Sequence, residues 1–239
     1  MGIKANNQYF CSIDNVGSKH STYIIDKIHS LLKQAQIKID EVDLIAYVNG
    51  PGSFTGLRVG LSVALGISFG LDINLVPVPA FALHAMAAAV ERVEQPEDSY
   101  DDTNSMLSSI EQLKDDGVFQ DDQDDILIGI DARIGQIYFA GVNLKTLDYF
   151  IEPQVINPDK IAVNRQYLLV GDGFNSYQNQ LTDNLKECQV LKMNYPSAKC
   201  LLKIVELDKY VQVLSVDADL MYLRNKVALD LNEQQQFKP

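Results

Sequence analysis

The chain has 239 residues, of which 46% are hydrophobic, so it is long enough to bury a substantial core in one large domain or two small ones. Its formal net charge is -12. A charge of this sign repels phosphate backbones, which makes the chain a poor candidate for binding RNA by itself.

The cysteines and the apolar segments indicate where the protein resides. Cys11, Cys188 and Cys200 lie far apart and in no paired spacing, which argues against a disulfide framework or a zinc site and favours a reducing compartment. No signal peptide opens the chain, and the longest uncharged apolar run, residues 59–71, is shorter than the roughly 20 residues of a membrane span. We therefore expect a cytoplasmic protein.

The first part of the chain alternates between strand and helix patterns. Tyr9, Cys11 and Ile13 fall on one side of an extended segment, which predicts a strand that turns at residues 15–18. Apolar residues then recur at helical spacing over residues 18–36. The remaining expected elements before residue 94 are strands at 44–48 and 74–78 and helices at 54–70 and 80–93.

The helix expected at residues 54–70 is apolar or small on nearly every side, and a helix of this kind must be covered almost all round. Glycine costs a helix about 1 kcal/mol relative to alanine, so Gly56 and Gly60 suggest the close approach of another backbone. Two interpretations stay open at this point. The segment is either an ordinary central helix of one domain or a helix shared between the core and a second subunit.

Acidic residues crowd into residues 94–125, around one weak helix at 106–114, which indicates a solvated insertion. It separates an expected N-terminal lobe, residues 1–93, from a C-terminal lobe, residues 126–239. Strands interleaved with helices in both parts predict an α/β fold. The elements expected in the second lobe are strands at 126–131, 136–142, 149–155 and 167–170 and helices at 158–163, 174–185 and 197–205.

The turn before the helix at 54–70 has the strand, glycine-rich loop and helix order of a phosphate-binding loop. Its spacing fits neither known type. Too few residues separate Gly52 from Gly56 for a P-loop, and the gap is one residue too long for the dinucleotide fingerprint that would begin at Gly50. Only opportunistic anion binding remains open there.

The residues that usually carry catalysis form no recognisable constellation. His20, His29 and His84 make no metal-binding pair on a helix, and no serine stands in a nucleophile elbow. Asp131 and Asp172 each end a predicted strand and would suit magnesium near a phosphate, although aspartate at a strand end is equally a turn former. We therefore expect no catalytic residue, no cofactor and no metal.

Residues 50–60 read GPGSFTGLRVG, a string that resembles the hallmark of the bacterial TsaB (YeaZ) family nearly letter for letter. Further matches follow in the family's order, and the resemblance covers essentially the whole chain. These further matches are His20-Ser21 and residues 130–133, 135–138, 171–173, 196–198 and 222–224.

This resemblance implies a two-lobed fold of the ASKHA superfamily, which includes actin, heat-shock chaperones and sugar kinases, with a degenerate nucleotide site. It also implies a non-catalytic scaffold subunit that pairs with TsaD, joined by TsaE, in forming N6-threonylcarbamoyladenosine next to the anticodon of tRNAs reading ANN codons. Alone, such a subunit forms a homodimer, and it reaches tRNA only indirectly.

In the family, the first two helices of the N-terminal lobe pack against the same pair in TsaD or in a second copy. The sequence departs from the family at its start, because members usually begin with an apolar strand and this chain enters at what resembles the second one. We therefore expect the first strand to be missing, which would expose a sheet edge. The expected interface residues are His20, Ile24, Ile28, Gly56, Leu57, Arg58, Gly60, Leu61 and Ala64.

Two alternative functions stay open. An ATP- and magnesium-dependent phosphotransferase of the same superfamily would act at Asp131 and residues 171–173. A peptidase, the activity once attached to relatives, would need a metal-binding histidine pair.

Overall fold

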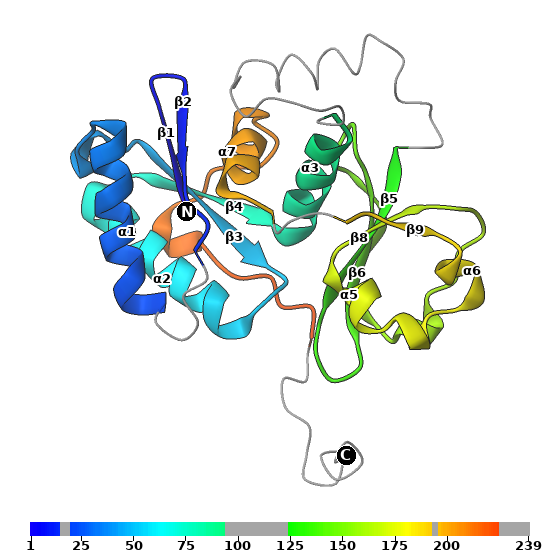
Figure 1. Cartoon of the computed structure of the whole chain (residues 1–239). Coiled ribbons are helices and arrows are strands. Elements are labelled where there is room, and N and C mark those ends of the chain that lie inside the picture. Colours follow the sequence, from blue (N-terminus) through cyan, green and yellow to red (C-terminus); the bar gives the residue numbers. More distant parts are fainter. Residues whose placement is uncertain (15–19, 94–123, 193–195, 225–239) are drawn as a thin grey trace, which may run out of the picture.

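The computed structural model describes residues 1–14, 20–93, 124–192 and 196–224. These residues have an α/β architecture with three sheets (Figure 1). Two two-stranded sheets lie in the N-terminal half, and a five-stranded mixed sheet forms the C-terminal half. The helices pack against these sheets and between them.

The chain opens with a hairpin, where the sequence pattern predicted a single strand. Strand β1 (Gly2–Ala5) pairs antiparallel with β2 (Gln8–Cys11). Asn6 and Asn7 form the turn, with φ angles of 50° and 61°. Positive φ at both central residues is typical of tight hairpin turns, and asparagine tolerates it well. Ile13 lies beyond β2, and the turn predicted at residues 15–18 lies outside the described residues.

The rest of the N-terminal half confirms the expected order of helices and strands. Strands β3 and β4 pair in parallel, and α2 makes the crossover connection that a parallel pair requires. Helix α1 contacts β1 and β2, whereas α2 contacts β3 and β4. The bounds are α1 (His20–Ala35), η1 (Ile39–Glu41), β3 (Leu44–Gly50), α2 (Phe54–Leu71), β4 (Asn74–Pro79) and α3 (Ala80–Val93).

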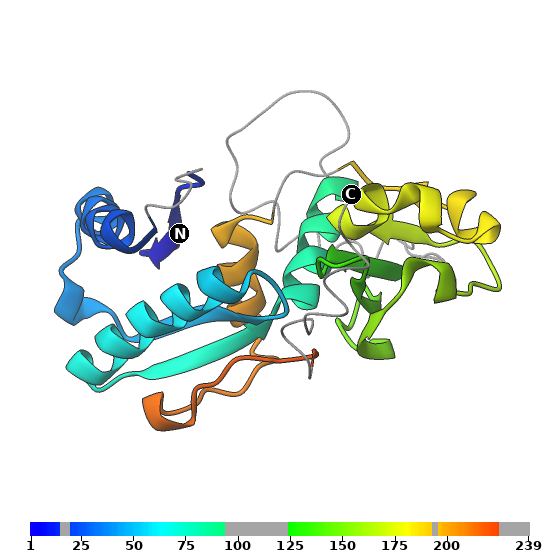
Figure 2. The ribbon, with the colours of Figure 1, turned by 90° about the horizontal axis from the view of Figure 1, so that it is seen from below.

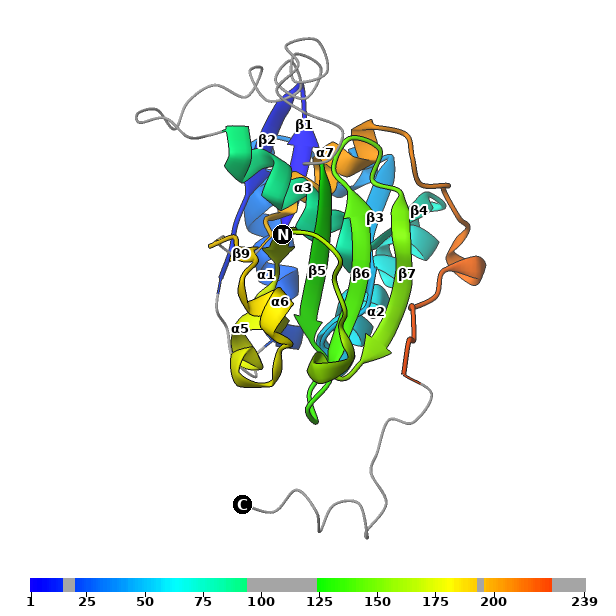
Figure 3. The ribbon, with the colours of Figure 1, turned by 90° about the vertical axis from the view of Figure 1, so that its right-hand side faces the viewer.

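The C-terminal sheet has the strand order β7-β6-β5-β8-β9. Figure 3 shows β5, β6 and β7 side by side in this sheet. β5, β6 and β7 run antiparallel as a meander, and β8 and β9 extend β5 in parallel. The short β9 was not predicted. The bounds are β5 (Asp125–Asp131), β6 (Ile137–Asn143), β7 (Tyr149–Ile156), β8 (Leu168–Val170) and β9 (Gln189–Val190).

The helix predicted over residues 174–185 is wrong, because the segment is broken. It consists of α5 (Asp172–Ser176), η3 (Gln178–Gln180) and α6 (Asp183–Lys186). Tyr177 interrupts it with non-helical φ and ψ of −121° and 26°, while its hydroxyl donates a hydrogen bond to the Asp131 carboxylate at 2.8 Å. A tertiary contact has therefore overridden local helix preference.

The two remaining predicted helices differ in their outcome. The helix expected at residues 158–163 is a single 3-10 turn, η2 (Pro158–Lys160). By contrast, α7 (Ala198–Glu206) forms where it was expected, and Ser197 caps it by accepting a hydrogen bond from the Cys200 N–H. A last 3-10 turn, η4 (Ser215–Asp217), lies in the C-terminal segment 208–224.

The predicted acidic insertion, residues 94–125, lies outside the described residues except for its last two. Those two do not form a solvated linker. Asp124 is buried and pairs with Lys145 at 2.7 Å, and Asp125 begins β5 and pairs with Arg165 at 2.7 Å. A buried carboxylate needs such partners, so both residues belong to the C-terminal half.

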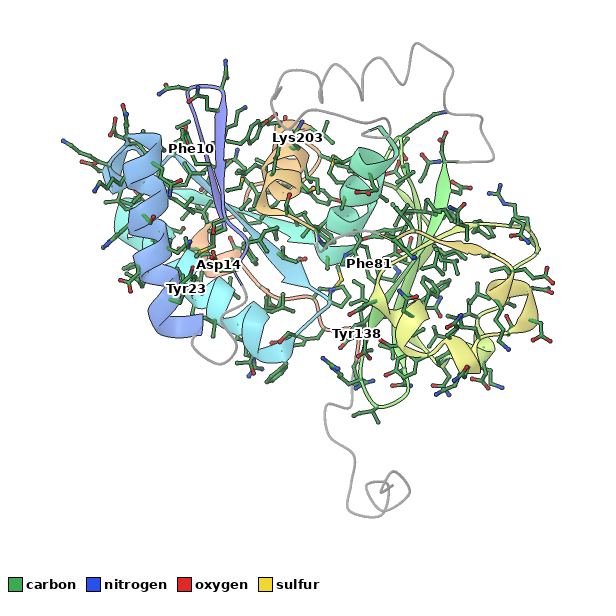
Figure 4. The ribbon with its side chains drawn as sticks, in the orientation of Figure 1. Phe10, Asp14, Tyr23, Phe81, Tyr138 and Lys203 are labelled. Atoms are coloured by element: carbon green, nitrogen blue, oxygen red, sulfur yellow. The ribbon has the colours of Figure 1, made fainter. Side chains whose placement is uncertain are left out.

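Helices α3 and α7 lie between the sheets and join the two halves into one core. Phe81 on α3 is fully buried and packs in a cluster with Val78 of β4, Ile128 of β5 and Ile204 of α7 (Figure 4). A second cluster covers the other face of the large sheet around Phe174. The two halves therefore share one hydrophobic cluster.

The close approach of β5 to α5 generates a stability prediction. At Gly171, φ is 105° and an added Cβ would lie 2.3 Å from the Gly129 carbonyl oxygen. Gly171→Ala should therefore lower the free energy of unfolding by roughly 3 kcal/mol or more, measured by urea denaturation. Gly135→Ala is the matched control, since φ is 71° there but the added Cβ meets nothing within 4 Å; its cost should be about 1 kcal/mol. Equal losses in the two variants would contradict this account.

Candidate functional site

Helix α2 starts directly after β3, and local chemistry sets both of its ends. Gly50 has a φ of 118°, and its peptide bond to Pro51 is cis. Ser53 caps the helix, because its Oγ accepts a hydrogen bond from the Gly56 N–H at 3.3 Å. Asp72 ends it in the left-handed conformation, with a φ of 56°.

One face of α2 packs against the chain's own core. Ala64 and Ser68 are its only buried residues. A row of leucines beside them covers β3, β4 and the C-terminal segment, which lies along the edge of β4 (Figure 2). The contacting residues are Leu57, Leu61 and Leu65 on α2 and Tyr47, Leu75, Val213 and Leu220 beneath them.

The opposite face of α2 is largely uncovered. At about 100° per residue, Val59 and Val63 point away from the buried row, and both are only half-buried. Near the helix end, Phe69 is 80% exposed. A helix this apolar that buries only two of its 18 residues leaves a surface that fits another molecule.

The glycines of α2 mark the same open side. A Cβ added at Gly60, Gly66 or Gly70 would meet no described atom within 4 Å. The close backbone that these glycines predict is therefore not supplied by the part of the chain that the structure describes. Gly56 differs, because its added Cβ would lie 3.3 Å from the Ser53 Oγ, so this glycine serves the cap.

Among the described residues, α2 is the one helix with the length and hydropathy of a membrane span. Lipid would have to surround such a helix. Here one side is attached to β3 and β4 and to the C-terminal segment, and Arg58 lies within the first turns. The packing is that of a helix on the surface of a folded domain, so the open side fits a protein partner better than lipid.

Helix α1 contacts α2 and adds apolar residues. Ile24 and Ile28 are half-buried, and Ile25 is 46% exposed. His20 begins α1, but its side chain lies outside the described residues. The two helices together therefore form the candidate surface.

Three of the expected interface residues do not face outward. Ala64 is 5% exposed and packs inside the core, while Leu57 and Leu61 lie in the row that contacts the sheet. Hydrophobic periodicity cannot tell which row of an apolar helix faces its own domain, because every row looks alike. The expected residues Arg58 and Gly60 are exposed.

Sequence patterns missed an aromatic cluster at the start of α2. The Arg58 guanidinium lies 3.7 Å from the ring centroid of Phe54, and its Nε donates a hydrogen bond to the Tyr222 hydroxyl at 3.2 Å. The two rings lie 6.4 Å apart. Since Tyr222 follows Arg58 by 164 residues, no local pattern joins them.

A cleft of about 1230 Å³ opens between the two halves beside the start of α2. The ends of β5 and α5, helix α3 and the C-terminal segment line it, and Tyr138 enters it from β6 (Figure 4). His84 also lines it; its Nδ1 donates to the Ala80 carbonyl at 2.8 Å, and burial lowers the pKa of the ring. The imidazole is therefore neutral at pH 7.

Asp131 and Asp172 do come together in this cleft. The Asp131 N–H donates to the Asp172 carboxylate at 2.9 Å, and the Asp131 carboxylate pairs with Arg133 at 3.0 Å and accepts the Tyr177 hydroxyl at 2.8 Å. The chain's own groups thus occupy both carboxylates. Within the described ranges, no three His, Cys, Asp or Glu side chains are grouped to hold a metal ion.

Comparison with known proteins extends these observations. A family model described as TsaD, tRNA N6-adenosine threonylcarbamoyltransferase, matches residues 14–99. The TsaB protein of Haemophilus influenzae, a tRNA threonylcarbamoyladenosine biosynthesis protein, is 27% identical over 225 residues, which cover 87% of this chain and 81% of that protein. A tRNA N6-adenosine threonylcarbamoyltransferase of Christiangramia forsetii is 34% identical over 89 residues, which cover 37% of this chain and 26% of that protein.

A solved structure shows the same fold. The crystal structure of an uncharacterized Pseudomonas aeruginosa protein with similarity to peptidase YeaZ superposes with a TM-score of 0.71 at 20% identity, covering 93% of both chains. The hallmark string of residues 50–60 forms the turn and first half-exposed part of α2, and the similarity to TsaB extends over most of both chains. Over most of its length the chain is therefore similar to the TsaB (YeaZ) proteins of tRNA threonylcarbamoyladenosine biosynthesis.

Proposed function

We propose that this protein is a non-catalytic scaffold subunit of the cytoplasmic machinery that forms N6-threonylcarbamoyladenosine in tRNA. One observation carries the proposal: α2 packs one face on its own sheet and leaves a glycine-containing apolar face open. Burying apolar area is the main favourable term in protein association, so a surface of this kind is suited to a permanent partner.

The partner that we propose is a TsaD-type subunit. The segment that matches the TsaD family model, residues 14–99, contains both α1 and α2. A TsaD protein should therefore carry a comparable helix pair. Two similar surfaces can pack about a two-fold or pseudo-two-fold axis, which also accounts for a homodimer when the chain is alone.

Two further members of the machinery fit the same scheme. TsaE would join the pair as a third subunit. The net charge of -12 opposes a direct contact with tRNA, so the RNA would be held chiefly by the partner.

The finer features of the fold also belong to this proposal. We infer an ASKHA-type arrangement of two lobes in which the N-terminal lobe takes one more strand between β1 and β3. In support, α7 packs against strands of both two-stranded sheets, yet the sheets are separate. Five of the seven residues of the apolar strand β3 are only half-buried, whereas parallel strands are normally covered on both sides.

The extra strand can be tested by hydrogen exchange. An apolar extended segment fused ahead of Met1 should slow amide exchange in β3 and raise the melting temperature, because it would satisfy two open sheet edges. A scrambled polar segment of the same length is the control. Unchanged exchange in β3 would refute the inferred position of the strand.

The phosphotransferase alternative rests on the cleft, where Asp131 and Asp172 meet beside Gly171. The engagement of the Asp131 carboxylate by Arg133 and Tyr177 speaks against a free magnesium ligand. We expect no binding of ATP with magnesium to the isolated chain in titration calorimetry. Micromolar binding would favour the enzyme instead.

The scaffold proposal is tested by Gly60→Glu. The variant should fold, because no described atom lies within 4 Å of the new Cβ, but an unpaired carboxylate in a dry helix contact costs roughly 3 kcal/mol or more. Co-purification with TsaD and dimerisation in light scattering should therefore be lost, at least about a hundredfold in Kd. Gly60→Ala should retain most of the binding.

Asn184→Glu on α6 is the matched control, because it adds the same charge at an exposed position in the C-terminal half. It should leave pairing unchanged. If the wild-type chain neither dimerises nor binds TsaD, or if Gly60→Glu binds as the wild type does, the scaffold proposal is wrong.

A further inference from the structure

Arg58 is the only charged residue among the 18 of α2. It is exposed and sits one residue before Val59, at the rim of the open face. A charged side chain at this position either stays in water when a partner docks or is drawn into the interface. The surroundings of Arg58 decide between these outcomes.

The side chain is held in place before any partner arrives. Phe54 stacks on the guanidinium at 3.7 Å, and Tyr222 accepts a hydrogen bond from its Nε. Tyr222 is itself fixed, since the neighbouring Met221 N–H donates to the Asn49 carbonyl at 2.7 Å. Little conformational entropy is therefore left to lose when Arg58 binds a ligand.

The terminal nitrogens of Arg58 have no acidic partner among the described residues. Arg133 and Arg165 each pair with an aspartate at 3.0 and 2.7 Å, in a chain with 32 acidic and 20 basic residues. No described carboxylate comes within 4.0 Å of Arg58, and its Nε alone is engaged. The two terminal nitrogens of the guanidinium match the geometry of a carboxylate, which can accept a hydrogen bond from each of them.

We propose that Arg58 is the charged anchor of the partner surface and that it receives a carboxylate from the TsaD-type subunit. The inference rests on the proposed function and adds the chemistry that the partner must present. A guanidinium covered by a partner next to an apolar face needs a counter-charge, because burying it unpaired would oppose binding. Arginine and aromatic residues are also the side chains that most often dominate such interfaces.

The test measures binding of the full chain to purified TsaD from the same organism. Arg58→Gln should weaken Kd by about tenfold or more and flatten its dependence on salt, whereas Arg58→Lys should lose part of the affinity because it lacks the planar fork. Lys160→Gln is the control; it makes the same change of net charge at a side chain that is 71% exposed on η2, away from the cleft.

Each outcome decides a separate question. If the wild type does not bind TsaD, the proposed function fails. If the wild type binds and the Kd of Arg58→Gln for TsaD stays within twofold of the wild-type value, the anchor is refuted. If the complex of that variant then binds tRNA more weakly, the arginine is assigned to a phosphate instead. The Tyr222→Phe variant tests whether Arg58 has only a structural role. If this variant lowers both the melting temperature and the affinity for TsaD as much as Arg58→Gln does, Arg58 serves only to hold the C-terminal segment.

Discussion

The attachment of one leucine row of α2 to β3 and β4 constrains the rest of the molecule. Because Leu57, Leu61 and Leu65 are committed to the sheet, Val59, Val63 and the glycines must face outward. The helix is too apolar to be an ordinary surface helix and too exposed to be a core helix. A folded domain keeps such a surface at some cost in solubility, which is understandable when a partner covers it.

The C-terminal segment connects this surface with the cleft. It pairs with β4 through Leu75 and Val213, passes Tyr222 to Arg58, and ends where Arg224 donates hydrogen bonds to Gln136 and to the Arg133 carbonyl. The C-terminal segment thus lines both the α2 surface and the cleft between the halves. The start of α2 therefore lies at the mouth of that cleft.

The cleft between the halves holds two carboxylates that the chain's own groups engage. Its carboxylates are close enough to form a site, but Arg133, Tyr177 and the Asp131 N–H already use them. A carboxylate engaged by hydrogen bonds and an arginine has little capacity left for a cation.

The sequence by itself determined the α/β pattern, the position of α2 and the resemblance to the TsaB (YeaZ) family, because these depend on local periodicity, turn residues and one contiguous string. The pattern also indicated that α2 is apolar or small on nearly every side. Only the tertiary structure decided which row of α2 is open, why Ala64 is unavailable, and that Tyr222 holds Arg58. It also broke the helix expected after Phe174 through the contact of Tyr177 with Asp131. These facts join residues far apart in the chain, and periodicity carries no information about such contacts.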